Sequence, residues 1–146
     1  MGTVRQASPG DAAECVRIYR PYVRDTAISW ELEVPTVAEM AARIVRAREI
    51  HEWLVLESDG RIVGMAYAGA LKARLPSYRW SVETGIYVEA DHHRAGHGRR
   101  LYGRLLARLT ERGYRQAFAA ITQPNEASNA FHRSFGFREA GLYRRV

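Results

Sequence analysis

Apolar residues in the first half of the chain follow helical spacing twice and then change to strand-like runs. After Ser8, which can cap a helix, apolar positions recur every three or four residues as far as Tyr22. The same spacing returns after Thr36, where Glu39 three residues on completes a capping box. The next two runs are separated by Asp59-Gly60, a strong hairpin signal. The elements predicted for this half are a strand at 4–7, helices that open at Pro9 and after Thr36, and strands at 52–57 and 61–71.

The second half alternates strands with helices. A strand-like alternation over residues 79–88 leads into a glycine-containing loop, and a helix then runs to about Arg112, closed by Gly113. The later predicted elements are a fifth strand at 116–122, a short helix at 126–135 and an extended segment at 137–146. Strand–helix–strand units favour parallel pairing, whereas the earlier hairpins are antiparallel. We therefore expect one domain over residues 1–146 with an α/β (α+β) fold and a mixed sheet.

Composition is that of an ordinary globular domain. The chain has 146 residues, of which 47% are hydrophobic and 26% charged, and no apolar run approaches the about 18–20 residues of a membrane span. The N-terminus has no apolar signal segment, and a single cysteine cannot form an internal disulfide, so we expect a cytoplasmic protein. That cysteine, Cys15, shares a helical apolar pattern with its neighbours and is interpreted as a core residue.

The net charge of +6 allows an anionic partner of several kinds. The arginines are dispersed, and many fall where the predicted helices face solvent. Nucleic-acid binding needs a contiguous basic face with exposed aromatic residues, and the sequence has no such stripe. We therefore expect neither a nucleic acid nor a membrane as partner.

The loop before the long second-half helix is the most informative segment. Gly96 and Gly98 lie two apart at the mouth of that helix, where backbone N–H groups and the positive helix end suit a phosphate. A dinucleotide-binding fingerprint needs a third glycine where Leu101 stands, and it follows the first strand rather than the fourth. The GxxxxGK[ST] sequence of a P-loop is absent. The phosphate must therefore belong to another ligand.

Three segments, in order, resemble the GNAT superfamily of acyl-CoA-dependent N-acyltransferases. The run from His93 to Gly98 resembles motif A (Q/R-x-x-G-x-G/A), and PNEAS at 124–128 with Phe131-His132 and FGF at 135–137 resembles motif B. Residues 80–83 and 87–88 resemble the central strand. The combination is similar to the phosphinothricin and methionine sulfoximine acetyltransferases and related L-amino-acid N-acyltransferases. Two departures are His93, where relatives have Gln or Arg, and a further Trp-rich strand that we expect to be missing.

The resemblance implies that the protein binds acetyl-CoA as acetyl donor between splayed fourth and fifth strands. Amides at the helix N-terminus are expected to bind the pyrophosphate. The backbone of the central strand is expected to bind the pantetheine arm, and the Val88 amide to donate to the thioester carbonyl. The cofactor-binding residues so implied are Ile86, Tyr87, Val88, His93, Arg94, Ala95, Gly96, His97, Gly98, Arg99, Asn125 and Ser128. Asn125 has a second interpretation as a helix cap. No metal is expected, because the clustered histidines lack further ligands.

The resemblance assigns the proton transfers to two residues. An α-amine with a pKa near ~8 is mostly protonated at neutral pH, so Glu83 is expected to act as the general base, directly or through water. Strand alternation places Glu83 on the face of Gly85 and Tyr87, opposite Val82. His132 is expected to protonate the departing thiolate. The alternatives are an ion pair of Glu83 with an arginine such as Arg79, and a merely polar role for His132.

The acceptor amine is expected on the other side of the splayed strands. Ser29-Trp30-Glu31 resembles the family's aromatic-Glu substrate loop, and LKARLPSY at 71–78 occupies the place of its basic carboxylate-binding positions. The substrate-binding residues so implied are Trp30, Glu31, Lys72, Arg74 and Tyr78. Solvated loop residues are the alternative interpretation of Lys72 and Arg74.

These residues together predict an N-acetyltransferase. We expect transfer from acetyl-CoA to the α-amine of a small amino-acid-like acceptor, such as phosphinothricin, methionine sulfoximine, methionine sulfone or an L-amino acid, by direct attack in a ternary complex. The alternatives are a GNAT enzyme acting on a polyamine, an aminoglycoside or a peptide N-terminus, and a non-catalytic acyl-CoA-binding module. A homodimer is expected from the resemblance alone.

Overall fold

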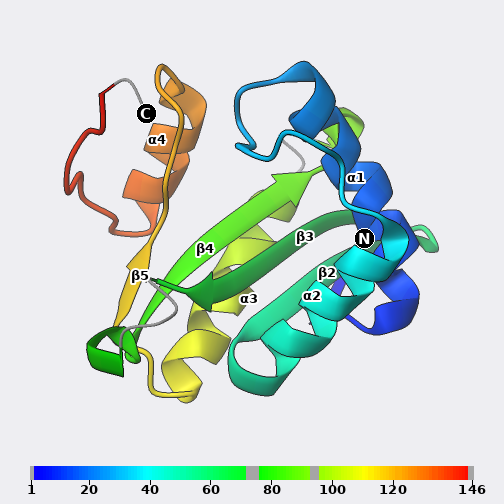
Figure 1. Ribbon diagram of the computed structural model, residues 1–146, viewed down its shortest axis with the longest axis horizontal. Coiled ribbons are helices and arrows are strands. Elements are labelled where there is room, and N and C mark those ends of the chain that lie inside the picture. The colour runs from blue at the N-terminus through cyan, green and yellow to red at the C-terminus, as the bar shows by residue number, and fades with distance from the viewer. Residues whose placement is uncertain (1, 72–75, 93–95, 145–146) are drawn as a thin grey trace.

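The structure is a computed structural model that describes residues 2–71, 76–92 and 96–144. A central sheet runs in the order β1-β2-β3-β4-β5 (Figure 1). Its strands are β1 (Gly2–Gln6), β2 (Glu52–Ser58), β3 (Arg61–Ala70), β4 (Ser81–Val88) and β5 (Gln116–Phe118). The helices are α1 (Ala12–Asp25), α2 (Val37–Ile50), α3 (His97–Glu111) and α4 (Glu126–Ser134), with 3-10 turns η1 (Pro9–Asp11), η2 (Pro76–Tyr78) and η3 (Ala90–His92). The first four strands pair antiparallel and β4–β5 is parallel, which confirms the expected mixed α/β sheet.

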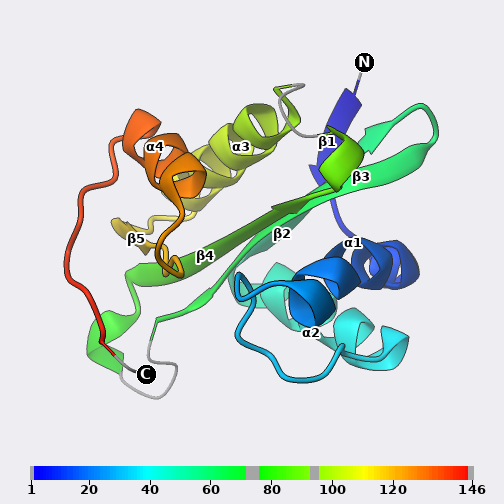
Figure 2. The same ribbon diagram turned by 90° about the horizontal axis from the view of Figure 1, so that it is seen from above.

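Helices cover both faces of this sheet. Helices α1 and α2 lie on one face, and α3 and α4 lie on the other (Figure 2). Strand alternation divides the core accordingly: Trp53 and Val55 of β2 belong to the α1–α2 side, and Leu54 and Leu56 belong to the α3–α4 side. Cys15 is fully buried in the first of these layers, and burial raises the pKa of its thiol to about 12, so the predicted core role is confirmed.

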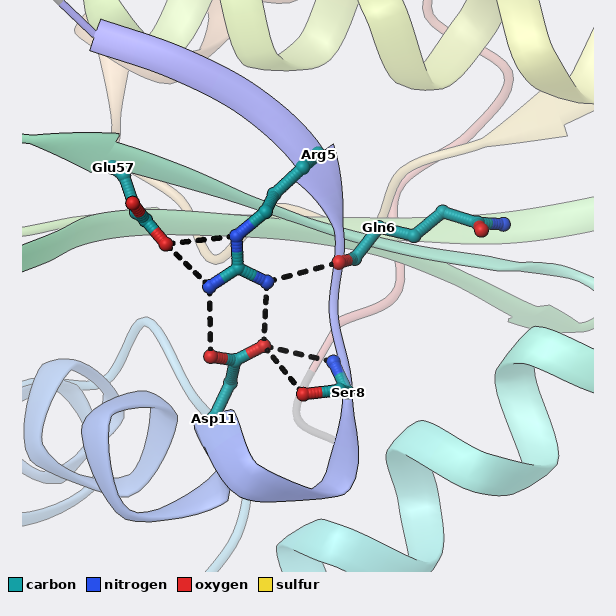
Figure 3. A network of polar contacts seen from close by, with 5 residues as sticks. All are labelled: Arg5, Gln6, Ser8, Asp11 and Glu57. Atoms are coloured by element: carbon teal, nitrogen blue, oxygen red, sulfur yellow. Dashed lines mark hydrogen bonds and ion pairs between the residues drawn. The ribbon is translucent and has the colours of Figure 1, made fainter.

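Local sequence signals place the beginnings of the first two helices. The Thr36–Glu39 capping box forms as predicted, because the Glu39 N–H donates to Thr36 Oγ1 and the Thr36 N–H to Glu39 Oε1. The helix expected to open at Pro9 instead begins with η1, and α1 follows from Ala12. Arg5 of β1 fixes this turn, because its guanidinium bridges Asp11 and Glu57 (Figure 3). That contact holds the pKa of Asp11 below its ordinary value.

Three predicted strands differ from the structure. The fifth strand was expected to reach residue 122 but ends at Phe118, because the chain turns away from β4 there and the next residues have no ladder partner. The extended segment predicted from residue 137 forms no strand over the described residues 137–144. Backbone conformation alone does not make a strand, since a ladder needs a neighbour to receive its hydrogen bonds. The strand expected from residue 79 begins at Ser81.

Candidate functional site

Strands β4 and β5 form a fork. They pair only over Ser81–Glu83 and Gln116–Phe118, and beyond this point the chain leads away from β4 into α4. A cavity of about 340 Å³ lies in the fork. It is lined by β3, β4, the α1–α2 loop, residues 119–122 and α4. The site residues expected from the sequence that line it are Trp30, Glu83, Ile86, Tyr87, Asn125, Ser128 and His132. Because neither strand fills the fork, side chains from both faces of the sheet meet in one cavity.

Glu83 lies where the fork opens. It is the last residue of β4 paired with β5, and its exposed side chain lines the cavity. The predicted alternation is confirmed, since Tyr87 packs with the α1–α2 layer and Val82 with the α3–α4 layer. Over the described residues the Glu83 carboxylate has no hydrogen bond or ion pair. Arg79 instead bonds the Pro76 carbonyl and stacks over Trp80, so the ion-pair alternative is not what the structure shows.

His132 approaches the same cavity from α4, on the other face of the sheet. Its side chain is buried, and Nδ1 lies 2.8 Å from the Ser128 carbonyl oxygen. A carbonyl only accepts, so Nδ1 carries the hydrogen and Nε2 holds the free lone pair in the neutral ring. Burial lowers the pKa of His132, and the bond to Ser128 offsets part of that change. The ring is therefore neutral near pH 7, with Nε2 able to accept a proton.

Asn125 and Ser128 shape the start of α4. The Asn125 side chain accepts a hydrogen bond from the Ser128 N–H at 3.2 Å, which makes Asn125 the helix cap that the alternative interpretation expected. Both side chains also line the cavity. Capping uses only Asn125 Oδ1, so the amide nitrogen is still able to donate to a ligand.

The loop between α1 and α2 supplies one wall of the cavity. Ser29 and Trp30 line it, whereas the neighbouring Glu31 does not. The Glu31 carboxylate is bidentate to Arg43 of α2 and also accepts from Tyr19 Oη. The Arg43 guanidinium keeps the pKa of Glu31 below its ordinary value. These contacts anchor the loop, and a role of Glu31 in substrate binding stays a prediction.

The glycine signal marks the N-terminus of α3. Gly96 is its N-cap at φ +79°, a left-handed conformation that favours glycine, and no heavy atom of the described residues lies within 4 Å of where a Cβ would stand. Gly98 packs near Phe131 of α4. Arg99 lies beside them, bonded to Ser134. A helix N-terminus that begins with a glycine in this conformation suits a bulky anion, because backbone N–H groups and the positive end of the helix point toward it.

The other predicted residues within the described part of the chain do not line the cavity. Val88 lies at the end of β4, where its carbonyl accepts from Tyr22 Oη, and Tyr78 lies in η2. His97 is the first residue of α3. The predicted residues outside the described part of the chain are Lys72, Arg74, His93, Arg94 and Ala95.

Sequence reasoning missed several residues of the cavity. Tyr67 of β3 lies across from Gly85 and covers it so closely that a Cβ at Gly85 would come within 2.6 Å of the tyrosine ring. Alternation along β3 could have placed Tyr67 on this face. Thr122 lies in a segment predicted as strand, and no local signal shows that it leaves the sheet.

Residues 2–71, 76–92 and 96–144 contain neither a cluster of metal-ligating side chains nor a membrane-spanning helix. No group of three or more His, Cys, Asp or Glu side chains there is placed to hold a metal ion. Likewise, no helix in those ranges has the length and apolar character that crossing a bilayer requires.

Comparison with known proteins agrees with this geometry. The family model described as "Acetyltransferase (GNAT) family" matches residues 14–137. The phosphinothricin N-acetyltransferase of Streptomyces viridochromogenes is 33% identical over 97% of this chain and 76% of its own. The L-methionine sulfoximine/L-methionine sulfone acetyltransferase of Salmonella typhimurium is 32% identical over 92% of this chain and 79% of its own.

A solved structure extends the likeness to three dimensions. The phosphinothricin acetyltransferase from Sinorhizobium meliloti in complex with AcCoA superposes with a TM-score of 0.91 at 33% identity, covering 96% of this chain and 76% of that one. The forked sheet, the glycine-capped α3 and the matching family model agree. This chain therefore belongs to the GNAT family and is an acetyltransferase.

Proposed function

We propose that this protein transfers the acetyl group of acetyl-CoA to the α-amine of a small amino-acid-like acceptor by direct attack in a ternary complex. The observation that carries the proposal is the cavity in the β4–β5 fork, where Glu83 enters from one face of the sheet and His132 from the other. Two substrates approaching from opposite faces can meet there without a covalent enzyme intermediate.

The donor fits the α3–α4 side of the fork. The glycine-capped N-terminus of α3 suits a pyrophosphate, and Arg99 in the first turn adds positive charge. Beyond Glu83, the described β4 has no β5 partner, so backbone groups of Ile86 face the cavity rather than a strand. Bound there, acetyl-CoA supplies a thioester acetyl group. Asn125 and Ser128 offer side-chain polar atoms to its amide-bearing arm.

Glu83 activates the acceptor. The α-amine carries a proton at neutral pH, because its pKa in water is near ~8, and it attacks only after losing that proton. Glu83 is suited to accept it, directly or through water, because no arginine competes for its carboxylate over the described residues. General-base catalysis of this kind contributes roughly 10²–10⁴-fold to the rate.

His132 completes the proton transfers. The amine nitrogen gives up a second proton as it bonds to the acetyl carbon, and His132 Nε2 accepts that proton. The Nδ1–H bond to the Ser128 carbonyl stays in place, so the ring keeps its orientation in both states. The lowered pKa of the buried ring makes the resulting imidazolium a stronger acid. Its Nε2–H then goes to the departing sulfur, which leaves with the electron pair of the broken thioester bond.

We propose that Arg74, Lys72 and Tyr78 bind the acceptor carboxylate, as the family resemblance implies, and that Trp30 forms a wall of the acceptor site. The support is the named activity of relatives on phosphinothricin, methionine sulfoximine and methionine sulfone, all amino-acid-like. We further propose a cytoplasmic homodimer, as the resemblance implies.

The decisive experiment is a thiol-release assay with acetyl-CoA and a panel of acceptors. The panel holds L-phosphinothricin, L-methionine sulfoximine, L-methionine sulfone, common L-amino acids, their decarboxylated amines and spermidine. We expect turnover confined to acceptors with an α-carboxylate, and its loss in Arg74→Ala but not in Arg46→Ala, which removes an exposed arginine of α2. Equal turnover of the decarboxylated amines or spermidine would contradict the acceptor class.

A further inference from the structure

A single hydroxyl joins the two arms of the cavity. The Trp30 indole Nε1–H donates to Thr122 Oγ1 at 2.6 Å, and the Thr122 hydroxyl donates to the Ala27 carbonyl at 2.7 Å. Thr122 thus uses one acceptor and one donor to bind the α1–α2 loop to the segment before α4. In Figure 1 these two segments reach toward each other beyond the fork. We name the Ala27–Trp30–Thr122 contact the clasp.

The clasp borders the cavity itself. Trp30 and Thr122 both line it, together with Ile28 and Ile121 from the same two segments. The cavity volume of about 340 Å³ is small for a ligand site, and small-molecule pockets span about 300–1,000 Å³. The position of a rigid indole at its margin therefore decides how large an acceptor side chain the cavity admits.

Little else fixes the Trp30 ring. Its side chain is 62% exposed, so packing holds it weakly. The residues on either side of Trp30 are held by α1 and α2: Ser29 Oγ lies 2.6 Å from Tyr19 Oη, and Glu31 is bidentate to Arg43. These anchors place the loop backbone, and the bond to Thr122 places the indole.

We propose that Thr122 is a specificity-determining residue, whose hydroxyl holds Trp30 as the wall that limits the acceptor side chain. This inference rests on the proposed function, because it concerns the acceptor end of the same cavity. Without the hydroxyl, the indole leaves its position and longer acceptors enter. Short acceptors then lose a wall that orients them.

The test compares Thr122→Val with two controls. Valine keeps the branched shape and removes both hydrogen bonds, whereas Thr122→Ser keeps the hydroxyl. Thr110→Val removes a hydroxyl that bonds the Leu106 carbonyl on the exposed face of α3, away from the cavity. For each variant, kcat/KM is measured with L-methionine sulfone and with L-tryptophan, which share the amine and carboxylate but differ in side-chain size.

The expected result is a change of preference. In Thr122→Val the ratio of kcat/KM for L-methionine sulfone to that for L-tryptophan falls about 3- to 10-fold, the effect of losing hydrogen bonds of this strength. The KM for acetyl-CoA stays unchanged, and Thr122→Ser and Thr110→Val keep the wild-type ratio. A wild-type ratio in Thr122→Val would overturn the inference. Failure of the wild-type protein to acetylate any acceptor would instead overturn the proposed function.

A second readout does not depend on activity. The Trp30 indole N–H is assigned in nitrogen–proton spectra by its loss in Trp30→Phe, and its exchange with solvent is followed in each variant. Hydrogen exchange of that group is expected to be faster in Thr122→Val than in the wild type and in Thr122→Ser. Equal exchange rates would show that the clasp does not hold the indole. Trp30→Phe is expected to shift the acceptor ratio in the same direction as Thr122→Val.

Discussion

Tyr102 of α3 and Thr84 of β4 meet at the point where the sheet divides, with 2.6 Å between Tyr102 Oη and Thr84 Oγ1. The Thr84 hydroxyl also donates to the Phe118 carbonyl at 3.4 Å, where the β4–β5 ladder ends. Tyr102 is fully buried, and its ring stands edge-on to His132 with 5.2 Å between centroids. One aromatic side chain thus contacts both the fork and the His132 ring.

Replacing Tyr102 by phenylalanine tests this support. The ring stays and the hydrogen bond to Thr84 is lost, so we expect the free energy of unfolding to fall by about 1–2 kcal/mol. Tyr114→Phe is the matched control, because it removes an exposed hydroxyl that bonds the Ile50 carbonyl, and its cost should be smaller. Urea titrations of the three proteins measure the difference. An equal fall in the free energy of unfolding in both variants would show that the buried Tyr102–Thr84 hydrogen bond stabilises the fold no more than the exposed one.

Gly85 is predicted to reject even one methyl group. A Cβ there would lie 2.6 Å from Tyr67 Cζ, so the ring or the strand must move. Overpacking of this kind costs about 1–3 kcal/mol, and the displaced ring would also narrow the cavity. Gly69→Ala is the control, since Gly69 also lines the cavity but no described atom lies within 4 Å of where its Cβ would stand. Thermal unfolding and the KM of the acceptor should change in Gly85→Ala only.

Glu52 is predicted to anchor the C-terminal end of α3. Its buried carboxylate bonds Arg108 at 2.9 Å and Arg112 at 2.5 Å. Burial by itself would raise the pKa of Glu52, but the two guanidiniums outweigh it and the pKa is lowered. Removing one partner of a buried pair costs about 3–5 kcal/mol, and the partly exposed arginines favour the lower end for Glu52→Gln. Glu49→Gln, at an exposed position of α2, should cost almost nothing in the same denaturant titration.

The pH dependence of stability should carry a contribution from His132. Because its pKa is lower in the folded protein than in the unfolded chain, the unfolded chain binds a proton first as pH falls below about 6.5. This contribution to stability is therefore complete above about pH 6.5 and is lost as pH falls toward the folded pKa. His51 shifts in the same direction, so the comparison needs a variant. Between pH 7.5 and 5.5, His132→Asn should lose less stability than the wild type. Equal losses would contradict a lowered pKa of His132 in the folded protein.

Local signals predicted much of the fold. The Thr36–Glu39 box and the Asp59-Gly60 turn involve residues close in sequence, and both form as expected, with Asp59 and Gly60 at positive φ. Period-two alternation placed Glu83 on its correct face. The motif resemblance brought Glu83 and His132 to one cavity, although nothing local to either residue requires it.

Contacts between distant residues set the limit of prediction. The fifth strand ends early because the chain leaves β4, and the sequence of residues 119–122 does not indicate this departure. The Glu31 carboxylate bonds Arg43 and Tyr19, each 12 residues away in the sequence, and no local signal indicates either contact. The role of Thr122 depends on its hydrogen bond to Trp30, which is 92 positions away in the sequence, and no local pattern predicts that contact.

The most direct test of the central claim is the rate of thiol release from acetyl-CoA with L-phosphinothricin in the wild type and in Glu83→Gln, measured side by side. The account predicts turnover in the wild type and a fall of roughly 10²–10⁴-fold in kcat for the variant, with the KM for acetyl-CoA unchanged. A Glu83→Gln enzyme with the wild-type rate would contradict the account, because acetyl transfer would then not depend on the carboxylate in the β4–β5 fork.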